Sequence, residues 1–589
     1  MRELLRLNPY FFRYKWRFFS GILFVVISTL LRVYSPNLVG DIIDNILSVI
    51  STYPKGLSVI PHSLQSDLWN FLGLYFLISL AEGFFVFLNR QTIIVVSRLI
   101  EYDIKNTIFT HYQFLDLSFY RKNNTGDLMN RITEDVSRVR MYLGPAIMYL
   151  LSLFFTLLIV IPILFHLNPK MAWWVLVPLP FLSATIYFVN NRIDAISEKL
   201  QEKLSDLTSY AQEIFSGIRV VKSFSRERSM HHLFAEQSDE YMNRAMKLAR
   251  MEALWFPSMN TFIGISLMLT VYFGGLSYFR NEVSAGDIAR YILYLNMLMW
   301  PVTSLGWVAG MIQRAMTSQR RINEFLDTRP CISPGNISAE TLKGEITFNG
   351  VSFVYPDTGI QALSEISFTI PTGQTWAILG KTGSGKTTIA DLIAKMYQPT
   401  QGTVLIDGID TNDWKTGVLR QHIGYVSQDI FLFSESIQDN ITFGCDPGMS
   451  KIAVDVAKMA AVHEDIIQFA NGYDTIVGER GVTLSGGQKQ RITIARALCR
   501  NPDILILDDC LSAVDATTEK TIQDALSKRQ HKKTTIIVTH RIFEHMQFDY
   551  ILVLDNGKIT EMGTPEQLAS ADGWYSRTLH QQDNQKERS

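Results

Sequence analysis

Two neighbouring aspartates, Asp508 and Asp509, follow directly on the apolar run ILIL, and carboxylates at the end of a buried strand suit a divalent cation. A glycine-rich stretch earlier in the chain, GKTGSGKT at 380–387, matches the pattern G-x-x-x-x-G-K-[ST]. Glycines let the backbone approach phosphate closely, Lys386 neutralises phosphate charge, and the hydroxyl of Thr387 is placed for Mg²⁺. The two motifs together predict a site for a nucleoside triphosphate, ATP, with Mg²⁺.

Residues along the whole glycine-rich stretch are candidates for contacts with the phosphates. They are Gly380, Thr382, Gly383, Ser384, Gly385, Lys386, Thr387 and Thr388. Asp508 is expected to hold the cation from the side opposite Thr387. The glycine motif by itself occurs in many unrelated NTPases, so it does not fix the reaction.

The segments around these motifs have the character needed to position them. An apolar strand leads into the glycine-rich turn and a helix follows it, in QTWAILGKTGSGKTTIADLI. Strand-like and helix-like segments alternate through the second half of the chain, which predicts an α/β P-loop NTPase domain over residues 344–589. A connector containing Pro, Gly and Ser, TRPCISPGNISAETLKG, places a linker at 328–343.

Composition divides the chain and limits its partners. The 589 residues are 47% hydrophobic and only 19% charged, a shortfall of charge that indicates membrane-embedded sequence. A net charge of -1 gives no support for a nucleic-acid partner. The four cysteines all lie in the second half, without C-x-x-C spacing, so we expect a reduced, cytosolic second half.

Six apolar segments in the first half are long enough to cross a bilayer, which takes about 20 residues. They lie near 18–38, 68–88, 143–165, 172–189, 262–279 and 288–308. Six in so short a stretch, several rich in Phe and Leu, argue against buried soluble helices. Residues 1–327 are therefore predicted to form an all-α, six-span transmembrane domain, whose first span is not a cleaved signal peptide because no A-x-A-like site follows it.

Lys and Arg residues cluster in the N-terminal stretch and in the connections after spans two and four. The positive-inside rule then predicts that both termini and these two long loops are cytoplasmic. Each loop reads as helix extending beyond the bilayer, with short breaks at RKNNTGD and FSGIRV that form its tip. We expect the tips to touch a cytosolic domain.

Polar and polarisable residues within the spans have two interpretations each. Arg32 and Glu82 are either functional or simply paired within the bundle or reaching the interface. Met297, Met299 and Trp300 in span six suit a surface for varied apolar ligands, but ordinary helix packing explains them nearly as well.

A further motif, TLSGGQKQR, lies shortly before the ILILDD strand. With it the sequence resembles an ATP-binding-cassette (ABC) transporter of the exporter type along essentially its whole length. The resemblance implies roles for Tyr355 in FVYP (stacking on adenine), Gln428 in YVSQD (near Mg²⁺ and the membrane domain) and His540 in IVTHR (sensing the γ-phosphate). It also implies that TIVGERG, at 475–481, precedes the signature, and that SAVD, ending at Asp515, crosses to a partner.

The resemblance implies that two such domains enclose two ATP molecules. Each ATP lies between the phosphate loop of one chain and the LSGGQ signature of the other, so the functional unit is a dimer. The signature residues expected to contact ATP are Ser485, Gly486, Gly487 and Gln488.

Asp509 departs from the family pattern, in which glutamate at this position polarises the attacking water. Aspartate lacks one methylene, so its carboxylate falls about 1.5 Å short. A misplacement of about 1 Å in a catalytic group costs on the order of 100-fold in rate. We therefore expect slow turnover at this chain's own site, with catalytic roles for Asp509, His540 and Gln428 and with Mg²⁺ held by Thr387, Gln428 and Asp508. The alternative is that a small backbone shift restores the geometry.

The sequence thus predicts a half-transporter that couples ATP binding and hydrolysis to export of hydrophobic or amphipathic molecules, drugs or lipids. A weak own site beside an intact signature resembles one half of the bacterial heterodimeric exporters. A homodimer with two slow sites, or an ATP-gated channel or sensor, are the alternatives. No targeting segment is evident, which favours a bacterial plasma membrane.

Overall fold

The computed structural model describes residues 2–52, 62–445, 450–478, 481, 484–511, 516–529, 533–543 and 546–586. The chain forms two compact units. The first comprises Met1–His111 and Gly126–Thr328, and the second comprises Tyr112–Thr125 and Arg329–Ser589. The short segment Tyr112–Thr125, from the first long loop, therefore belongs to the second unit.

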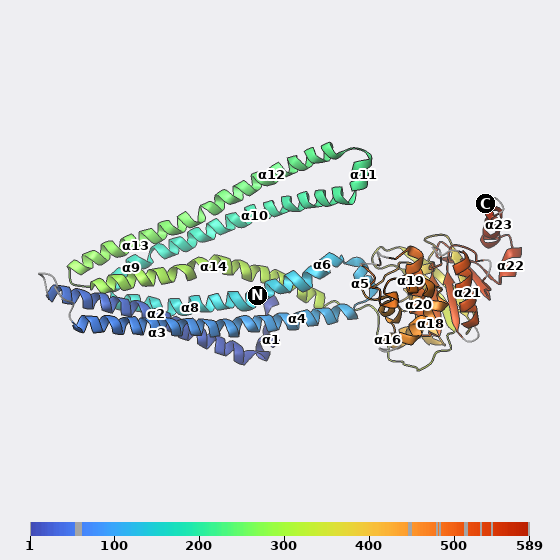
Figure 1. The fold of residues 1–589 in the computed structure, drawn as a ribbon, viewed down its shortest axis with the longest axis horizontal. Helices are drawn as coiled ribbons and strands as arrows, with labels where there is room; N and C mark the ends of the chain where they lie inside the picture. Colours follow the sequence, from blue (N-terminus) through green and yellow to red (C-terminus); the bar gives the residue numbers. More distant parts are fainter. Residues whose placement is uncertain are drawn as a thin grey trace. The chain divides into compact units, whose positions relative to one another are not determined.

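The first unit is built of long helices (Figure 1). Six stretches within the described residues are long and apolar enough to cross a membrane, which confirms the predicted six-span, all-α fold. The helices that supply these stretches are α2 (Lys15–Thr52), α3 (His62–Asn89), α8 (Ile147–Leu167), α9 (Pro169–Leu176), α10 (Pro178–Ser216), α13 (Trp255–Phe279) and α14 (Ala285–Leu326). The fourth span, Pro169–Ser216, combines α9 and α10, which meet at Val177 because Pro178 lacks the N–H of one helical bond.

Helices extend beyond the apolar spans, as the sequence predicted. One hairpin of this kind consists of α10 and α12 (Glu227–Ala253), which run side by side and are closed by α11 (Ile218–Ser223) (Figure 1). The other helices of this kind are the long α4 (Val95–Phe114) and the six-residue α6 (Thr125–Asn130) and α7 (Val136–Met141). Single π-helical turns at Arg90–Ile94, Arg131–Asp135 and Tyr142–Ala146 join them to α3 and α8, and two short helices, Arg2–Leu7 and α1 (Asn8–Arg13), begin the chain.

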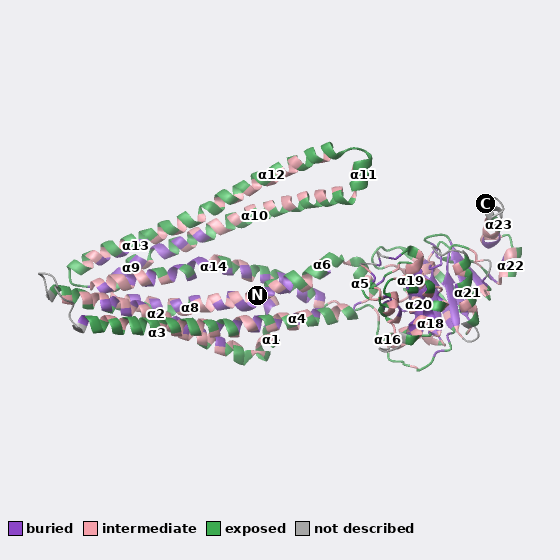
Figure 2. Ribbon diagram, viewed as in Figure 1, coloured by how far each residue is buried: buried purple, intermediate pink, exposed green. Residues whose placement is uncertain are grey.

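Helix α14 supplies much of the interior of this unit (Figure 2). Tyr291 and Tyr294 are fully buried there, and each hydroxyl donates to a backbone carbonyl of another helix, Leu164 (2.6 Å) and Val33 (3.0 Å). These bonds satisfy carbonyls within an apolar interior and fix α14 against its neighbours. Arg32 Nε donates to Glu82 Oε1 at 2.7 Å, which supports the paired interpretation of these two residues.

The second unit holds two sheets and short helices. A six-stranded sheet has the order β10-β9-β3-β8-β7-β6 and is parallel except for its edge strand β10, which pairs antiparallel with β9. A four-stranded antiparallel sheet has the order β2-β1-β4-β5. The strands are β1 (Ile346–Val354), β2 (Gln361–Ile370), β3 (Thr375–Gly380), β4 (Gln401–Ile406), β5 (Ile409–Asp410), β6 (Ile423–Val426), β7 (Ile504–Asp508), β8 (Thr534–Val538), β9 (Tyr550–Asp555) and β10 (Lys558–Gly563). The predicted α/β class is confirmed.

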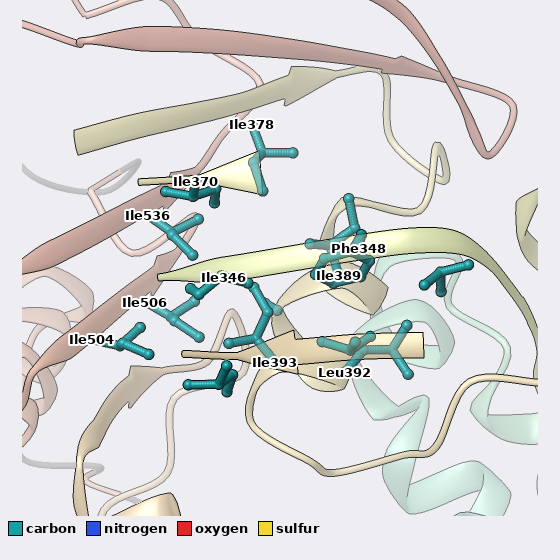
Figure 3. Close-up of a cluster of buried hydrophobic side chains, with 14 of the residues drawn as sticks. Ile346, Phe348, Ile370, Ile378, Ile389, Leu392, Ile393, Ile504, Ile506 and Ile536 are labelled. Carbon is teal, nitrogen blue, oxygen red and sulfur yellow. The ribbon is translucent and has the colours of Figure 1, made fainter. Parts of the chain in front are cut away.

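The two largest buried apolar clusters of the second unit lie on opposite faces of its parallel sheet. One packs both sheets against α15 (Lys386–Ile393), and Figure 3 shows its Ile, Leu and Phe side chains. The other lies among α17 (Ile437–Thr442), α18 (Ser450–Met459), α20 (Gly486–Cys499) and the opposite face of β7. The remaining helices are α5 (Leu117–Lys122), α16 (Thr416–Gln421), α19 (His463–Gln468), α21 (Ala516–Arg529), α22 (Pro565–Ser570) and α23 (Trp574–Lys586), with a 3₁₀ turn at Gly472–Asp474.

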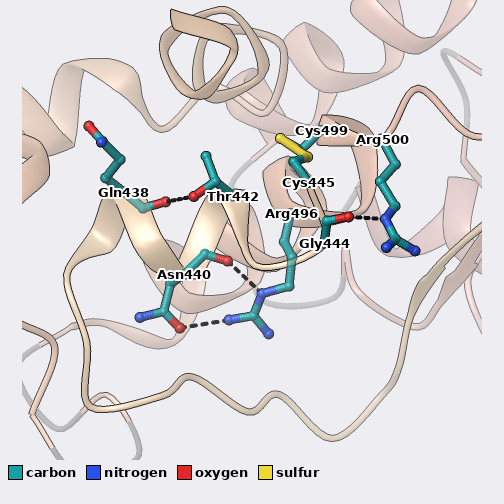
Figure 4. Close-up of a disulfide and its surroundings, with 8 residues drawn as sticks. All are labelled: Gln438, Asn440, Thr442, Gly444, Cys445, Arg496, Cys499 and Arg500. Carbon is teal, nitrogen blue, oxygen red and sulfur yellow. Dashed lines mark hydrogen bonds between the residues drawn. A yellow bond between two sulfur atoms is a disulfide. The ribbon is translucent and has the colours of Figure 1, made fainter. Parts of the chain in front are cut away.

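Two of the four cysteines are paired. Cys445, just after α17, and Cys499, the last residue of α20, form a disulfide across 54 residues (Figure 4). The expectation of reduced thiols was wrong for this pair, because α17 packs on α20 and brings together two positions whose sequence spacing carries no signal. Cys331 and Cys510 are free thiols.

Candidate nucleotide site

The sequence-predicted residues of the ATP site converge because four parallel strands end at one edge of a sheet. Strands β3, β8, β7 and β6 are successive neighbours, and their carboxyl ends lead into Gly380, His540, Asp508 and Gln428. Open α/β sheets bind ligands at this edge. A cavity of about 420 Å³ lies there, and its lining includes eleven of the predicted residues. These are Tyr355, Thr382, Gly383, Gly385, Lys386, Thr387, Thr388, Gln428, Asp508, Asp509 and His540.

The glycine-rich turn adopts backbone conformations that side chains disfavour. Gly385 has φ +100°, and a Cβ there would lie 2.4 Å from the carbonyl oxygen of Ala362. The turn leads into α15, whose first N–H groups and dipole favour an anion. The hydroxyl of Ser384 is buried without a hydrogen-bond partner, as a group that awaits a ligand would be. The turn is therefore built to receive phosphate.

Lys386 is held inside this turn. Its Nζ donates to the carbonyl oxygens of Gly380 (2.8 Å) and Lys381 (2.7 Å). Burial lowers the pKa of Lys386, and the charges of Asp508 and Asp509 oppose that shift. A half-buried ammonium with two acidic neighbours gains a strong further partner when a phosphate enters.

Asp508 meets the requirements of a Mg²⁺ ligand. The residue is 1% exposed, and its Oδ2 is buried without a hydrogen-bond partner. Burial raises the pKa of Asp508 to about 6, with Asp391 and Asp509 adding to the shift and the Thr387 hydroxyl opposing it. No cluster of three or more His, Cys, Asp or Glu occurs among the described residues, so a cation here would need Thr387, Gln428 and the phosphates to complete its shell.

Asp509 and His540 face each other across the cavity edge. The Nδ1 of His540 lies 3.2 Å from Oδ1 of Asp509. Asp509 has φ +48°, a left-handed conformation that aspartate tolerates better than most residues, and its N–H donates to the carbonyl of Val538 at 2.8 Å. The backbone of Asp509 is thus tied to β8, the strand that leads to His540.

An aromatic group forms the other end of the cavity. The hydroxyl of Tyr355 lies 2.9 Å from that of Thr388, and its ring meets those of Phe353 and Tyr397 edge to face. Burial raises the pKa of Tyr397 to about 12. These contacts fix the ring of Tyr355 at one side of the cavity, where a flat base has an apolar surface to stack on.

The signature residues lie apart from this cavity. Ser485 caps α20, accepting from the N–H of Gln488, while the Gln488 side chain accepts from the N–H of Ser485. Gly486 and Gly487 form the first turn of the same helix. Asp515 and the rest of SAVD lie outside the described residues, as do two residues of the TIVGERG segment.

Several residues that line the cavity carry no motif in the sequence and were not predicted. Asp357, Thr358, Gln361 and Val538 come from the segments beside Tyr355 and from the end of β8. Arg121 is the least expected, because it precedes the ATP-binding half by more than 200 residues. Its signal was the loop break RKNNTGD, which was predicted only to touch a cytosolic domain.

Two protein families match separate parts of the chain, one in the membrane half and one in the nucleotide-binding half. A family described as the ABC transporter transmembrane region matches residues 18–302, and one described as ABC transporter matches residues 363–512. The chain therefore belongs to the ABC transporters, as an exporter with fused membrane and nucleotide-binding domains, and it is a multi-pass membrane protein and an ATPase coupled to transport.

Among its relatives is the probable multidrug resistance ABC transporter ATP-binding/permease protein YheI of Bacillus subtilis, 33% identical over 99% of this chain and 98% of the relative. An ATP-dependent lipid A-core flippase of Aromatoleum aromaticum is 34% identical, with 86% of this chain and 84% of the flippase covered. A solved bacterial Atm1-family ABC exporter with ATP bound has a TM-score of 0.79 at 26% identity, covering 96% of this chain and 98% of that one.

Proposed function

We propose that this chain is one half of a heterodimeric exporter, in which its own ATP site turns over slowly and its signature serves the site of a partner. The observation that carries the proposal is Asp509, a short acid that lies against His540 at the edge of a cavity also lined by Lys386, Thr387 and Asp508.

In this proposal ATP lies along the cavity. Its adenine stacks on Tyr355, and its phosphates lie in the turn formed by Gly380, Thr382, Gly383, Ser384, Gly385, Lys386, Thr387 and Thr388. Thr387, Gln428 and Asp508 hold Mg²⁺, which supplies charge neutralisation to the β- and γ-phosphates. His540 senses the γ-phosphate.

The chemistry of the site depends on the reach of one carboxylate. A general base must approach the water whose proton it accepts, and loss of such help costs about 10² to 10⁴-fold in rate. Asp509 ends about one C–C bond, roughly 1.5 Å, short of where glutamate would place its carboxylate. Because the charge is retained, nucleotide binding survives while hydrolysis slows.

The second site of the dimer is where this chain's signature acts. Ser485, Gly486, Gly487 and Gln488 lie outside the cavity of their own chain, which suits residues that contact ATP bound to another chain. A partner with glutamate at the position of Asp509 then carries most of the turnover.

Substrates in this proposal are hydrophobic or amphipathic molecules, drugs or lipids. Named relatives are a probable multidrug resistance transporter and a lipid A-core flippase, and both substrate classes are amphipathic or apolar. The membrane is the bacterial plasma membrane, with both termini cytoplasmic. ATP draws the two nucleotide-binding domains together, and the loop tips at 121–126 and 216–220 pass that closure to the spans, because ATP binds the closed state better.

The test is the Mg²⁺-ATPase rate of the purified full-length chain in lipid, compared between wild type and Asp509→Glu. We expect a slow wild type and an acceleration of at least tenfold by glutamate, because the lengthened carboxylate regains its reach. Asp509→Asn keeps the size and removes the charge, and it should lower the residual rate further. Asp572→Glu is the matched control, since it makes the same change at a 99% exposed side chain.

An ordinary exporter rate in wild type, unchanged by glutamate, would overturn the slow-site assignment and favour a homodimer. If Asp509→Glu raises the ATPase rate, a second half-transporter should be captured with this chain from its native membrane. The ATPase rate of the pair should then depend on the partner's glutamate at the position of Asp509. ATP binding without hydrolysis in any dimer, together with ion conductance, would instead support a channel or sensor.

A further inference from the structure

One short helix from the first half of the chain lies in the ATP-binding unit. Helix α5 begins after Asp116, whose carboxylate accepts from the N–H of Phe119 (3.3 Å) and from the N–H of Cys331 (2.6 Å). Asp116 also accepts from the hydroxyl of Ser118. The carboxylate therefore joins the start of α5 to the linker that leads into the nucleotide-binding domain.

The same helix places a guanidinium at the aromatic end of the cavity. The Cζ of Arg121 lies 5.3 Å from the centroid of the Tyr355 ring and 5.6 Å from that of Tyr397, both within the range of cation–π attraction. Arg121 also lines the cavity in which Lys386 and Asp508 lie at the phosphate end. Tyr355 and Tyr397 thus hold the guanidinium of Arg121 at the aromatic end of the cavity.

We propose that Arg121 is an adenine-binding residue, and that adenine enters between its guanidinium and the ring of Tyr355. A planar guanidinium stacks on a base as an aromatic ring does, and each such stack contributes measurably to affinity. The inference rests on the proposed stacking of adenine on Tyr355, which it extends by a second, opposing surface.

The distance between Arg121 and the Tyr355 ring implies that Arg121 moves when adenine binds. Two van der Waals separations of about 3.5 Å require roughly 7 Å between the guanidinium and the ring, whereas the distance is 5.3 Å. Adenine therefore displaces Arg121 by about 2 Å. Because Asp116 holds the start of α5 to residue 331, entry of the base pushes on a segment that connects directly to α4 and α6 of the membrane unit.

A different role for Arg121 predicts different behaviour. If its charge simply attracted phosphate, Arg121→Lys would keep the ATP affinity, and Arg121→Ala would weaken the binding of any triphosphate. If Arg121 blocked the ring of Tyr355, its removal would strengthen ATP binding. A stacking residue differs from both, because its effect depends on the base and on the planar shape of the side chain.

The test measures binding of ATP and of inorganic tripolyphosphate to the full-length chain in lipid, by displacement of a fluorescent nucleotide. Arg121→Ala should weaken ATP about tenfold, Arg121→Lys should recover little of this, and tripolyphosphate affinity should be unchanged in both. Lys122→Ala removes the neighbouring cation of the same helix and is the matched control, with no change expected. Unchanged melting temperatures exclude misfolding as the cause.

Three results would overturn the inference: unchanged ATP affinity in Arg121→Ala, tighter ATP binding in that variant, or an equal loss for tripolyphosphate. Tyr355→Ala separates this inference from the assignment beneath it. If that variant loses ATP affinity while Arg121→Ala does not, only the role of Arg121 fails. If neither variant loses affinity, the adenine site itself is wrongly placed.

Discussion

Arg496 ties the helix that carries the signature to its surroundings, and its loss should destabilise that part of the second unit. Its Nε donates to the carbonyl of Asn440 (2.7 Å), and its two terminal nitrogens donate to Asn440 Oδ1 (2.7 Å) and to the carbonyl of Phe431 (2.9 Å). The guanidinium also lies over the rings of Phe433 (5.9 Å) and Phe443 (5.7 Å). Figure 4 shows the contacts with Asn440 beside the disulfide.

The loss of stability expected for Arg496→Ala follows from these contacts. Three hydrogen bonds at about 1 kcal/mol each and two cation–π contacts at about 0.5 kcal/mol each give about 4 kcal/mol for Arg496→Ala. A domain of this size loses about 2–4 °C per kcal/mol, so the apparent melting temperature should fall by roughly 8–16 °C. Arg496→Lys keeps the charge but not the planar guanidinium with its several N–H donors, so it should recover less than half of the lost stability.

The assay is the thermal loss of fluorescent nucleotide binding by the intact chain in lipid, which reports on the second unit alone. Arg500→Ala is the matched control, because Arg500 is an exposed arginine whose side chain bonds one carbonyl, that of Gly444. We expect its effect to stay within about 1 kcal/mol. Equal melting temperatures for Arg496→Ala and Arg500→Ala would refute the reasoning, since the counted contacts would then contribute nothing.

Gly385→Ala should weaken ATP binding at least tenfold in the same nucleotide assay, because its Cβ would lie 2.4 Å from a backbone oxygen at φ +100°, whereas Gly417→Ala, with no atom within 4 Å, should be neutral. Asp508→Asn should abolish the dependence of ATP affinity on Mg²⁺ while leaving Mg²⁺-free binding nearly intact, as a titration of Mg²⁺ would show. Tyr291→Phe should lower the melting temperature of the membrane unit, measured by tryptophan fluorescence in detergent, because it removes the buried hydroxyl that bonds the carbonyls of Leu164 and Asn168, at a cost of about 1–3 kcal/mol.

The spans were predictable because length and apolarity alone decide whether a helix suits a bilayer. Their helical extensions were predictable as well, from charge and periodicity that continue past the apolar windows. The boundary between α9 and α10 at Val177 was not predicted, although Pro178 stood in the sequence, because a window of hydropathy does not register one missing N–H.

The convergence of Gly380, Gln428, Asp508 and His540 was predictable for a related reason, since each lies at or just after the carboxyl end of a strand in one parallel sheet. Arg121 and the Cys445–Cys499 disulfide were not predictable. Both depend on contacts between segments far apart in the chain, and such contacts leave no local pattern of periodicity, capping or turn residues.

The backbone around Asp509 bears on whether its short side chain is simply accommodated. A shift of about 1.5 Å toward the cavity would have to break the bond from its N–H to Val538, 2.8 Å long, at a cost of about 0.5–1.5 kcal/mol. It would also move a carboxylate that already meets His540. Every 1.4 kcal/mol of activation free energy changes the rate tenfold. The cost of breaking this bond would therefore cancel part of the rate that the backbone shift recovers. The hydrogen bond from the N–H of Asp509 to β8 thus opposes a backbone shift that would move the carboxylate toward the cavity. With the backbone held in place, Asp509→Glu changes only how far the carboxylate reaches.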